Sequence, residues 1–526
     1  MKKKKLVVAL VRGPIVYGDG AINNEATPAI GFAYLAGYLR QYGYDPVIVD
    51  GIGEGLNQTW PLERYPGYNC HGLTFAEIVE RIPSDSDVIG FSGMFSGEWP
   101  VMRDLITEVR KHFPKAFLVA GGEHVSSLTE YSLRDCPALD VCVRGEGERT
   151  FYQLLEHYAE CGEVADIHGV GYLDNSGVFC MPLRTELRKG ESGTDPARIR
   201  DIDEIPWPYW PEGYMEKFWA AEKSYGVSTE RDMPFQFSRG CPYECTFCSN
   251  PLMWGNAYRL RDVEDVMKEI YYYVDRYDIT AIQLYDLTAI TKKSWIVDFC
   301  KQLIASGLKL KLSLPSGTRS EALDNEVLEL LKKAGCNYLV YAPESGSPRT
   351  LQLIKKAIKL DKLTDSVMEA KRQGIAVRTN LIIGFPGETW GDVFKTLLYG
   401  LKMAVKGVDD IPIFVFSPYP GTEIFHQLQQ QGVLNLNDQY LLKLQTMNSN
   451  YLSTKVMTFN PHTRARLLGV VRMVFILANY IVGYLFHPSR ILRTIRSVLT
   501  GKGTATVLEH RLKDLLRRNI RKDPVV

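Results

Sequence analysis

Three cysteines stand close together in the segment RGCPYECTFCSNP (239–251): Cys241, Cys245 and Cys248. Their C-x3-C-x2-C spacing offers three thiolates on one loop, whereas a structural zinc site takes four ligands. Cys300 and Cys336 are the nearest cysteines downstream, too far along the chain to belong to the same loop. Three thiolates suit a [4Fe–4S] cluster with one open iron, because that iron can bind a substrate or cofactor directly. A zinc site, or cysteines brought together by coincidence, is the alternative.

Alternating strands and helices are predicted on the N-terminal side of this loop. Helix-period stretches at 29–43 and 100–113 lie between short apolar runs rich in β-branched residues, which are typical of buried parallel strands. The runs are LVVAL (6–10), PVIVD (46–50), VIGFS (88–92), FLVAG (117–121) and LDVCV (139–143). Five strands with crossover helices predict a doubly wound, Rossmann-like sheet.

A second alternation begins just before the cysteines. Its predicted strands are PFQFS (234–238), AIQLYD (281–286), LKLSL (310–314), NYLVYA (337–342), VRTNLIIG (377–384) and IPIFVF (411–416). Six such β/α units predict a partial (β/α)6 barrel rather than a complete eightfold one. The irregular stretch between the two alternations contains a predicted hairpin, 169–181, and a proline-aromatic run, 205–211. It is interpreted as a linker packed on the surface.

The fold class is therefore α/β, divided into four segments. We expect a Rossmann-like domain over 1–160, a linker over 161–232, a partial barrel over 233–430 and a helical C-terminal region over 431–526.

Composition narrows the class of protein. The 526 residues include 62 Lys and Arg against 61 Asp and Glu, so net charge gives no attraction to nucleic acid. Seven of the ten cysteines are scattered without a pairing rhythm, as in a reducing cytosol. The N-terminal MKKKKLVVALVRGP has too short an apolar run for a signal peptide. We expect a cytoplasmic protein.

The cysteine loop, with Phe247 just before its last cysteine and a predicted barrel strand before it, resembles the radical S-adenosylmethionine family. The resemblance implies that the open iron of a [4Fe–4S] cluster chelates the amino and carboxylate groups of S-adenosylmethionine. One electron from the reduced cluster would then release a 5′-deoxyadenosyl radical. A low-potential electron donor such as flavodoxin or ferredoxin is the partner this chemistry implies.

Later segments resemble the parts of that family that hold S-adenosylmethionine. In YAPESGS (341–347), Glu344 and Ser345 would hold its ribose or methionine part, and Arg319 would reach its carboxylate. In LIIGFPGET (381–389), Gly384 would allow the adenine to approach closely. Asp286 ends the second barrel strand, at the face where barrel chemistry occurs. For each, a helix cap or a turn is the structural alternative.

The N-terminal sheet resembles the cobalamin-binding domain that precedes many such barrels. VDGIGEG (49–55) stands where these domains have Asp-x-His-x-x-Gly, but Ile52 replaces the histidine and cannot ligate cobalt. Cobalamin would therefore bind without a protein histidine as its lower ligand. The residues implied are Asp50, Gly55, Ser92, Met94, Gly121, Gly122, Gly145 and Glu146. A ligand-free Rossmann-like domain is the alternative, although the GEGE loop (145–148) is hard to explain by packing alone.

Together these resemblances imply a cobalamin-dependent radical methyltransferase that acts on an unactivated carbon, or a phosphorus, of a small-molecule or lipid-like substrate. A radical cyclase or rearrangement enzyme is the alternative, because the anaerobic magnesium-protoporphyrin cyclase and hopanoid-modifying enzymes resemble this chain in architecture. A methylthiotransferase would need a second three-cysteine cluster, which the sequence lacks. A non-enzymatic redox or cobalamin sensor would not need the S-adenosylmethionine segments.

The C-terminal region leaves a membrane question open. LLGVVRMVFILANYIVGYLF (467–486) is long enough to span a bilayer, but Arg472 and Asn479 interrupt it. It is interpreted as a helix that covers the barrel; peripheral contact with the inner membrane is the second interpretation. Among the histidines, His124 is expected to be a solvent-facing helix cap.

Overall fold

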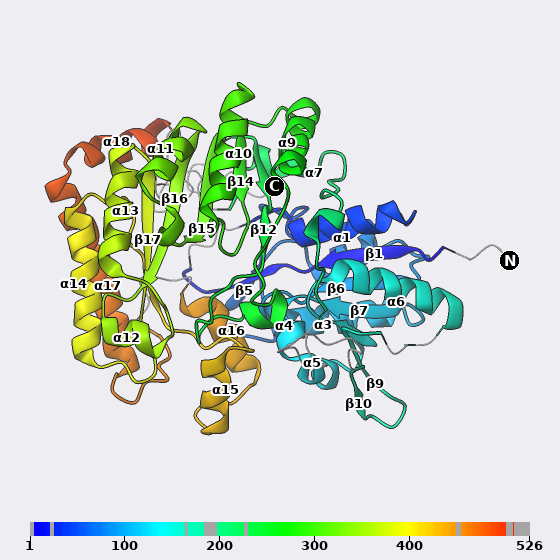
Figure 1. Cartoon of the computed structure of the whole chain (residues 1–526). Helices are drawn as coiled ribbons and strands as arrows, with labels where there is room; N and C mark the ends of the chain where they lie inside the picture. Colours follow the sequence, from blue (N-terminus) through cyan, green and yellow to red (C-terminus); the bar gives the residue numbers. More distant parts are fainter. Residues whose placement is uncertain are drawn as a thin grey trace, which may run out of the picture.

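The computed structural model describes residues 5–21, 26–162, 164, 167–182, 197–225, 230–448, 454–500 and 509. Two α/β units dominate it: an N-terminal sheet and a barrel-like sheet, with the helices of residues 465–500 on the outside of the second (Figure 1).

The N-terminal unit is built on a seven-stranded sheet in the order β10-β9-β8-β7-β6-β1-β3. Its parallel strands are β1 (Val8–Arg12), β3 (Val47–Asp50), β6 (Val88–Ser92), β7 (Phe117–Gly121) and β8 (Val141–Val143), which confirms the five predicted runs. Its helices are α1 (Ile30–Gln41), α2 (Phe75–Arg81), α3 (Trp99–His112), α4 (Glu123–Ser127), α5 (Thr129–Asp135) and α6 (Gly147–Cys161), with a 3-10 turn at Ser96–Glu98. The strands are buried on both faces, as crossover helices require.

Two features of this unit differ from the prediction. The hairpin β9 (Val170–Leu173) and β10 (Phe179–Cys180) pairs antiparallel with β8, so part of the predicted linker extends the sheet. A small antiparallel sheet, β2 (Ile15–Gly18), β4 (Thr59–Pro61) and β5 (Tyr68–His71), was not predicted. Its strands of three or four residues are too short to give a period-two signal.

The second unit is a six-stranded parallel sheet in the order β11-β14-β15-β16-β17-β18, the partial barrel expected. The strands are β11 (Asp232–Phe235), β14 (Ala281–Leu284), β15 (Lys311–Thr318), β16 (Cys336–Glu344), β17 (Ala376–Ile383) and β18 (Ile413–Val415). Its helices are α9 (Val263–Tyr277), α10 (Lys293–Ala305), α11 (Asn325–Lys333), α12 (Pro348–Leu353), α13 (Leu360–Arg372) and α14 (Trp390–Val405), with a 3-10 turn at Ser320–Ala322. A short ribbon, β12 (Ser238–Arg239) with β13 (Arg259–Leu260), and α8 (Asn250–Met253) frame the cysteine loop.

Between the two units, the 3-10 turn Ile202–Glu204 and α7 (Tyr214–Ala220) bury apolar side chains against both. Ile52 of the first unit, Phe218 of α7 and Phe235 of β11 belong to one hydrophobic cluster. The interdomain segment is therefore part of the core rather than a loose surface connection.

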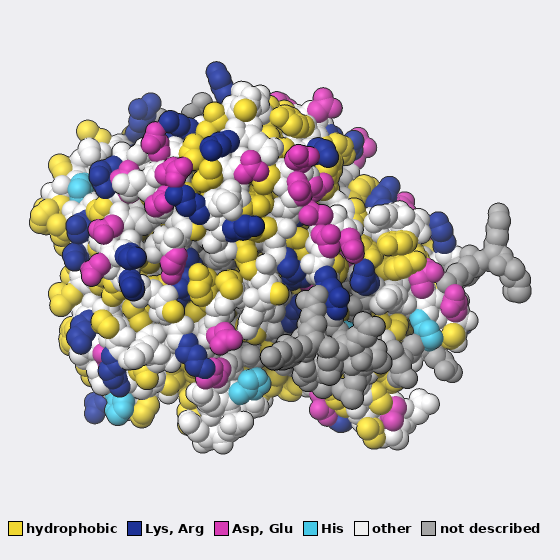
Figure 2. Space-filling view, in the orientation of Figure 1, with side chains coloured by type: hydrophobic (Ala, Val, Ile, Leu, Met, Phe, Trp, Pro, Cys, Tyr) yellow, Lys and Arg dark blue, Asp and Glu magenta, His cyan; other side chains and the backbone are white. Residues whose placement is uncertain are grey.

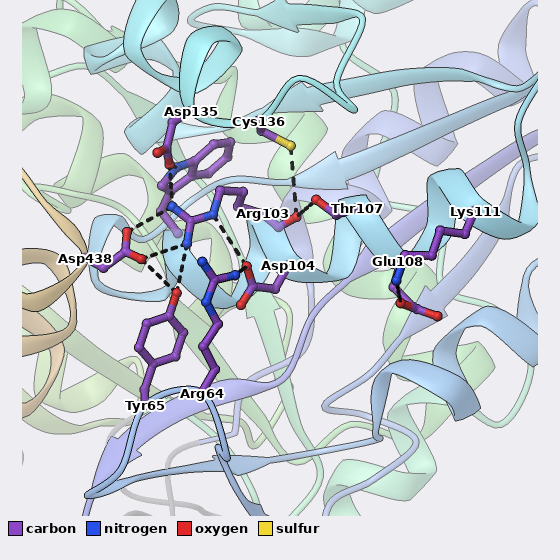
Figure 3. Close-up of polar contacts among 11 residues, drawn as sticks. Arg64, Tyr65, Arg103, Asp104, Thr107, Glu108, Lys111, Asp135, Cys136 and Asp438 are labelled. Carbon is purple, nitrogen blue, oxygen red and sulfur yellow. Dashed lines mark hydrogen bonds and ion pairs between the residues drawn. The ribbon is translucent and has the colours of Figure 1, made fainter.

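The described part of the predicted C-terminal region, 431–526, is helical: α16 (Asp438–Met447), α17 (Ala465–Phe486) and α18 (Ser489–Thr500). Residues 449–453, 501–508 and 510–526 lie outside the described residues. Helix α15 (Glu423–Gln430) comes just before this region, inside the segment predicted for the barrel. Helix α16 packs on the N-terminal unit, where Asp438 accepts hydrogen bonds from both terminal nitrogens of Arg103, at 2.9 and 2.7 Å (Figure 3). Asp135 and Tyr65 complete this cluster around Arg103. Helix α17 lies against α14 and β18, outside the barrel.

Candidate active site

The cysteine loop leaves the barrel directly after β12. Gly240 has φ +83°, and a Cβ there would lie 2.2 Å from the carbonyl oxygen of Ala257, so only glycine fits before the first cysteine. The Cys241 Sγ lies 3.4 Å from Thr288 Oγ1, and the Cys248 N–H donates to the Cys245 carbonyl. The loop thus holds its three thiols on one turn at the carboxyl edge of the barrel.

The three thiols are the metal donors of this loop. Among the described residues, no group of three or more His, Cys, Asp or Glu, these thiols included, is arranged to hold one ion. Burial raises the pKa of Cys245 and raises that of Cys248 to about 12, so a bound metal must draw off their protons. Three thiol donors without a fourth are the donor set of a cluster with one open iron.

Charged groups gather around Cys245. Lys356 Nζ lies 2.9 Å from Glu344 Oε1, and both side chains are nearly buried. Burial lowers the pKa of Lys356, but the neighbouring Glu344 and Cys245 more than offset this, so the pKa is raised and the ammonium stays charged. Glu344 has φ +64°, a strained conformation for a non-glycine residue. Arg319 lies over the Tyr243 ring, 3.4 Å from its centroid.

This arrangement places two cations beside the loop, each with a carboxylate partner: Lys356 pairs with Glu344, and Arg319 pairs with Glu321 at 2.9 Å. Such groups suit the carboxylate and the hydroxyls of an amino-acid nucleoside such as S-adenosylmethionine. Of the residues predicted for this cofactor, Glu344 and Arg319 therefore lie together, next to Cys245.

The other residues predicted for this cofactor have protein partners. Both Asp286 oxygens accept hydrogen bonds from the Phe237 and Ser238 segment, and burial raises the Asp286 pKa to about 6. Ser345 Oγ contacts Thr396 Oγ1 at 2.8 Å, below Glu344. These contacts hold the carboxyl ends of β14 and β16, as the structural alternative expects, and the contact of Asp286 and Ser345 with a cofactor stays a prediction.

Phe247 and Gly384 also pack against protein. The Phe247 ring lies 5.6 Å from that of Phe385. Gly384 has φ +89°, and the space of its absent Cβ is taken by Leu468 of α17 at 2.6 Å. The close approach that Gly384 permits here is therefore that of a helix.

The carboxyl edge of the N-terminal sheet faces the same interdomain region. The strand order reverses between β1 and β6, and ligands of doubly wound sheets bind at such a switch point. Ser92 and Met94, which follow β6, are half-buried, as is Gly121 at the end of β7. A Cβ at Gly121 would meet nothing closer than 3.5 Å, so this residue leaves room for a ligand.

The remaining predicted cobalamin residues are held by protein. Asp50 is buried and accepts a hydrogen bond from Tyr214 Oη at 2.6 Å. A Cβ at Gly55 would lie 2.5 Å from the Leu73 nitrogen, so close packing requires this glycine. Gly122 and Gly145 both have positive φ, and the Gly145 N–H donates to Ser126 Oγ. Their contact with cobalamin stays a prediction.

The GEGE loop connects the two units. Glu146 lies 2.8 Å from Arg259 and 3.4 Å from Arg239, and Glu148 lies 2.6 Å from Arg239. These side chains are at most 12% exposed, and Arg239 stands two residues before Cys241. The GEGE loop therefore has a structural role that the sequence did not indicate: its carboxylates form an ion-pair network between the two units.

A second loop of the N-terminal unit touches the cysteine loop. Glu123, which follows the paired glycines of β7, accepts a hydrogen bond from Ser249 Oγ at 2.5 Å. Ser249 directly follows Cys248. The expectation for the next residue, His124, is wrong: it is fully buried, stacks on Trp99, and burial lowers its pKa to about 3. The short helix α4 turns this side chain into the core instead of outward.

Sequence reasoning missed Lys356, Arg239 and Glu123. Lys356 lies in a lysine-rich connection between α12 and α13, KKAIK (355–359), so nothing local marks it. Arg239 and Glu123 lie within two motifs noted in the sequence, RGC (239–241) and AGGEH (120–124). Their position in these motifs was the one signal that could have indicated them.

The structure thus combines a parallel sheet, whose carboxyl edge has room for a ligand, with a partial barrel that carries a loop of three thiols. Residues 24–155 match the B12 binding domain, and residues 235–399 match the radical SAM superfamily. The chain is 30% identical to the "uncharacterized methyltransferase PH0819" of Pyrococcus horikoshii, over 80% of this chain and 83% of that protein. It is 29% identical to cytidylyl-2-hydroxyethylphosphonate methyltransferase of Streptomyces wedmorensis, over 78% and 79% of the two chains.

Among solved structures, the cobalamin-dependent S-adenosylmethionine radical enzyme OxsB with aqua-cobalamin bound has the same fold. The TM-score is 0.66 at 15% identity, over 99% of this chain and 81% of that one. The chain belongs to the cobalamin-dependent radical S-adenosylmethionine enzymes. Its cofactors are a [4Fe–4S] cluster, S-adenosylmethionine and cobalamin.

Proposed function

We propose that this enzyme transfers a methyl group to an unactivated carbon, or to a phosphorus, of a small-molecule or lipid-like substrate. The observation that carries the proposal is the hydrogen bond between Ser249 of the cysteine loop and Glu123 of the cobalamin domain. Because these two loops meet, the two cofactors would bind next to one another between the domains. The two curated relatives described above are both named methyltransferases.

The cofactors, when bound, supply the radical that activates the substrate and the methyl group that it receives. The protein's own contribution is binding and positioning. We propose that Cys241, Cys245 and Cys248 hold the cluster, and that Lys356 and Arg319 bind the carboxylate of S-adenosylmethionine. Glu344, which pairs with Lys356, would accept hydrogen bonds from the hydroxyl or amino groups of S-adenosylmethionine once Lys356 turns toward that ligand.

For the N-terminal unit we propose that Ser92, Met94 and Gly121 line the cobalamin site, where the sheet edge is open. Position 52 is a buried isoleucine in the hydrophobic core. An isoleucine has no lone pair for cobalt, which supports binding without a histidine ligand from this position. A low-potential donor such as flavodoxin or ferredoxin would reduce the cluster.

The test is anaerobic reconstitution with cobalamin and methyl-labelled S-adenosylmethionine, followed by mass spectrometry of cell extracts incubated with the protein. We expect 5′-deoxyadenosine together with label on a product. Deoxyadenosine without label transfer would favour cyclisation or rearrangement, the second candidate. Cys245→Ala should lose both the cluster iron and deoxyadenosine; a variant that keeps them would refute the cluster assignment.

A further inference from the structure

Helix α17 distributes its polar residues in the reverse of the usual way. Arg472 is fully buried and donates to the Met447 carbonyl at 2.7 Å, and buried Asn479 donates to the Ile411 carbonyl at 3.5 Å. Leu468 and Phe475 lie on the same face, against the barrel. The two residues that interrupt the apolar run therefore fix the helix to the protein.

The opposite face of α17 is apolar and open to solvent. Val474, Leu477, Ile481 and Leu485 are 54%, 53%, 59% and 73% exposed. Their spacing of three, four and four residues places them on one side of the helix. By length and composition, α17 is the one helix of the described residues that could cross a membrane, and a third of its most apolar window is buried.

Neighbouring helices continue this apolar face. Helix α14, which packs beside α17, exposes Phe394 (56%) and Leu398 (65%). Helix α18 exposes Leu492 (72%) and Leu499 (79%). Figure 1 shows the three helices together on the left of the molecule, and Figure 2 shows hydrophobic side chains along that edge. Soluble monomers rarely expose so much contiguous apolar surface without using it. We call these exposed side chains of α14, α17 and α18 the outer face.

The charged side chains that α14, α17 and α18 expose are all cations. Residues 439–500 contain eight Lys and Arg and no Asp or Glu. Exposed cations also flank α14, whose single acid, Asp392, is buried. The exposed cations on these helices or next to their ends are Lys395, Lys402, Lys406, Arg464, Arg466 and Arg496. Apolar side chains and cations on the same helices complement an anionic bilayer surface, with acyl chains beneath phosphate groups.

We infer that the outer face docks on an anionic lipid bilayer, with α17 and α18 lying in the interface. A spanning orientation would break the hydrogen bonds that Arg472 and Asn479 donate to the Met447 and Ile411 carbonyls, whereas docking in the interface keeps them. The inference rests on the proposed function only in that a lipid-like substrate would explain why the enzyme docks on a bilayer. Leu468, on the inner face of α17, packs on Gly384, so the bilayer would lie one helix away from the barrel edge.

The test is flotation of the full-length protein with vesicles of phosphatidylcholine alone, or with about 30% phosphatidylglycerol. We expect binding to the anionic vesicles, weakened when salt rises from ~0.1 to ~0.5 M. Leu477→Glu/Ile481→Glu should bind at least about tenfold more weakly. The matched control, Val178→Glu/Val433→Glu, adds the same charge at side chains 57% and 54% exposed elsewhere, and should bind normally.

Absence of vesicle binding by the wild type, or equal binding by the two double variants, would overturn the inference. Light scattering of the same samples gives a further refutation. A wild-type dimer that becomes a monomer in Leu477→Glu/Ile481→Glu would assign the outer face to a second copy of the chain. None of these measurements needs cofactors, so failure here is separate from failure of methyl transfer.

Discussion

The ion pairs between the GEGE loop and the cysteine loop give the sharpest prediction about stability. The Arg239 side chain is 3% exposed and lies 2.6 Å from Glu148, which is 7% exposed. The rings of Tyr34 and Trp254 lie 5.2 and 5.1 Å from the guanidinium and help to exclude water. In Arg239→Met, Glu146 keeps Arg259, whereas Glu148 loses the one ion pair it makes among the described residues.

Removing one partner of a buried pair costs about 3–5 kcal/mol, because the other charge stays buried without compensation. In a cooperative unit of 150–250 residues, 1 kcal/mol shifts Tm by about 2–4 °C, so the expected decrease is roughly 6–20 °C. Scanning calorimetry of the full-length protein under anaerobic conditions measures this shift. The second variant, Arg239→Met/Glu148→Met, removes both charges and should recover most of the loss.

The matched control is Arg149→Met, one residue further along α6. Arg149 pairs with Glu204 at 3.1 Å, but these side chains are 52% and 56% exposed. An exposed pair contributes at most about 1 kcal/mol, so Tm should change by less than about 4 °C. The reasoning is refuted if Arg239→Met behaves like this control, or if the losses of Arg239→Met and Glu148→Met simply add.

Two further predictions concern single side chains. Lys356→Met should weaken S-adenosylmethionine binding about 10–100-fold, the effect of losing one charge-assisted hydrogen bond. The control Lys355→Met changes an exposed lysine that pairs with Glu423, and it should bind normally. Calorimetric titration of the reconstituted proteins compares the two, and equal affinities would contradict the assignment. Burial raises the Asp286 pKa from 3.8 to about 6, so as pH rises this group ionises in the unfolded chain before it ionises in the folded one. The free energy of unfolding should therefore decrease by about 3 kcal/mol as pH rises from about 4 to 6. Asp286→Asn should lack that part of the pH dependence in urea unfolding; the same slope in both proteins would show that Asp286 is not buried as a neutral acid.

Most of the architecture could be predicted because its signals are local. Five apolar runs gave five parallel strands, and six more gave the partial barrel, since buried strands leave continuous β-branched runs. The small sheet of β2, β4 and β5 was not predicted because its strands are only three or four residues long. The hairpin at 170–180 was predicted, but its pairing with β8 depends on tertiary contact.

The candidate site divides in the same way. The spacing of Cys241, Cys245 and Cys248 indicated the cluster because all three ligands lie on one loop. His124 was misjudged because a glycine-rich loop looks exposed in sequence, whereas its helix packs onto Trp99.

The sequence by itself determined the strand and helix pattern, the three-thiol loop and the absence of a histidine at position 52. Only the tertiary structure decided which charges pair: Glu148 and Arg239 are 91 residues apart in the chain. It also decided that α17 turns Arg472 inward and its apolar stripe outward. The physical reason is that hydrophobic periodicity and loop spacing are properties of neighbouring residues. Burial and electrostatic partnership depend on which surfaces meet once the domains pack.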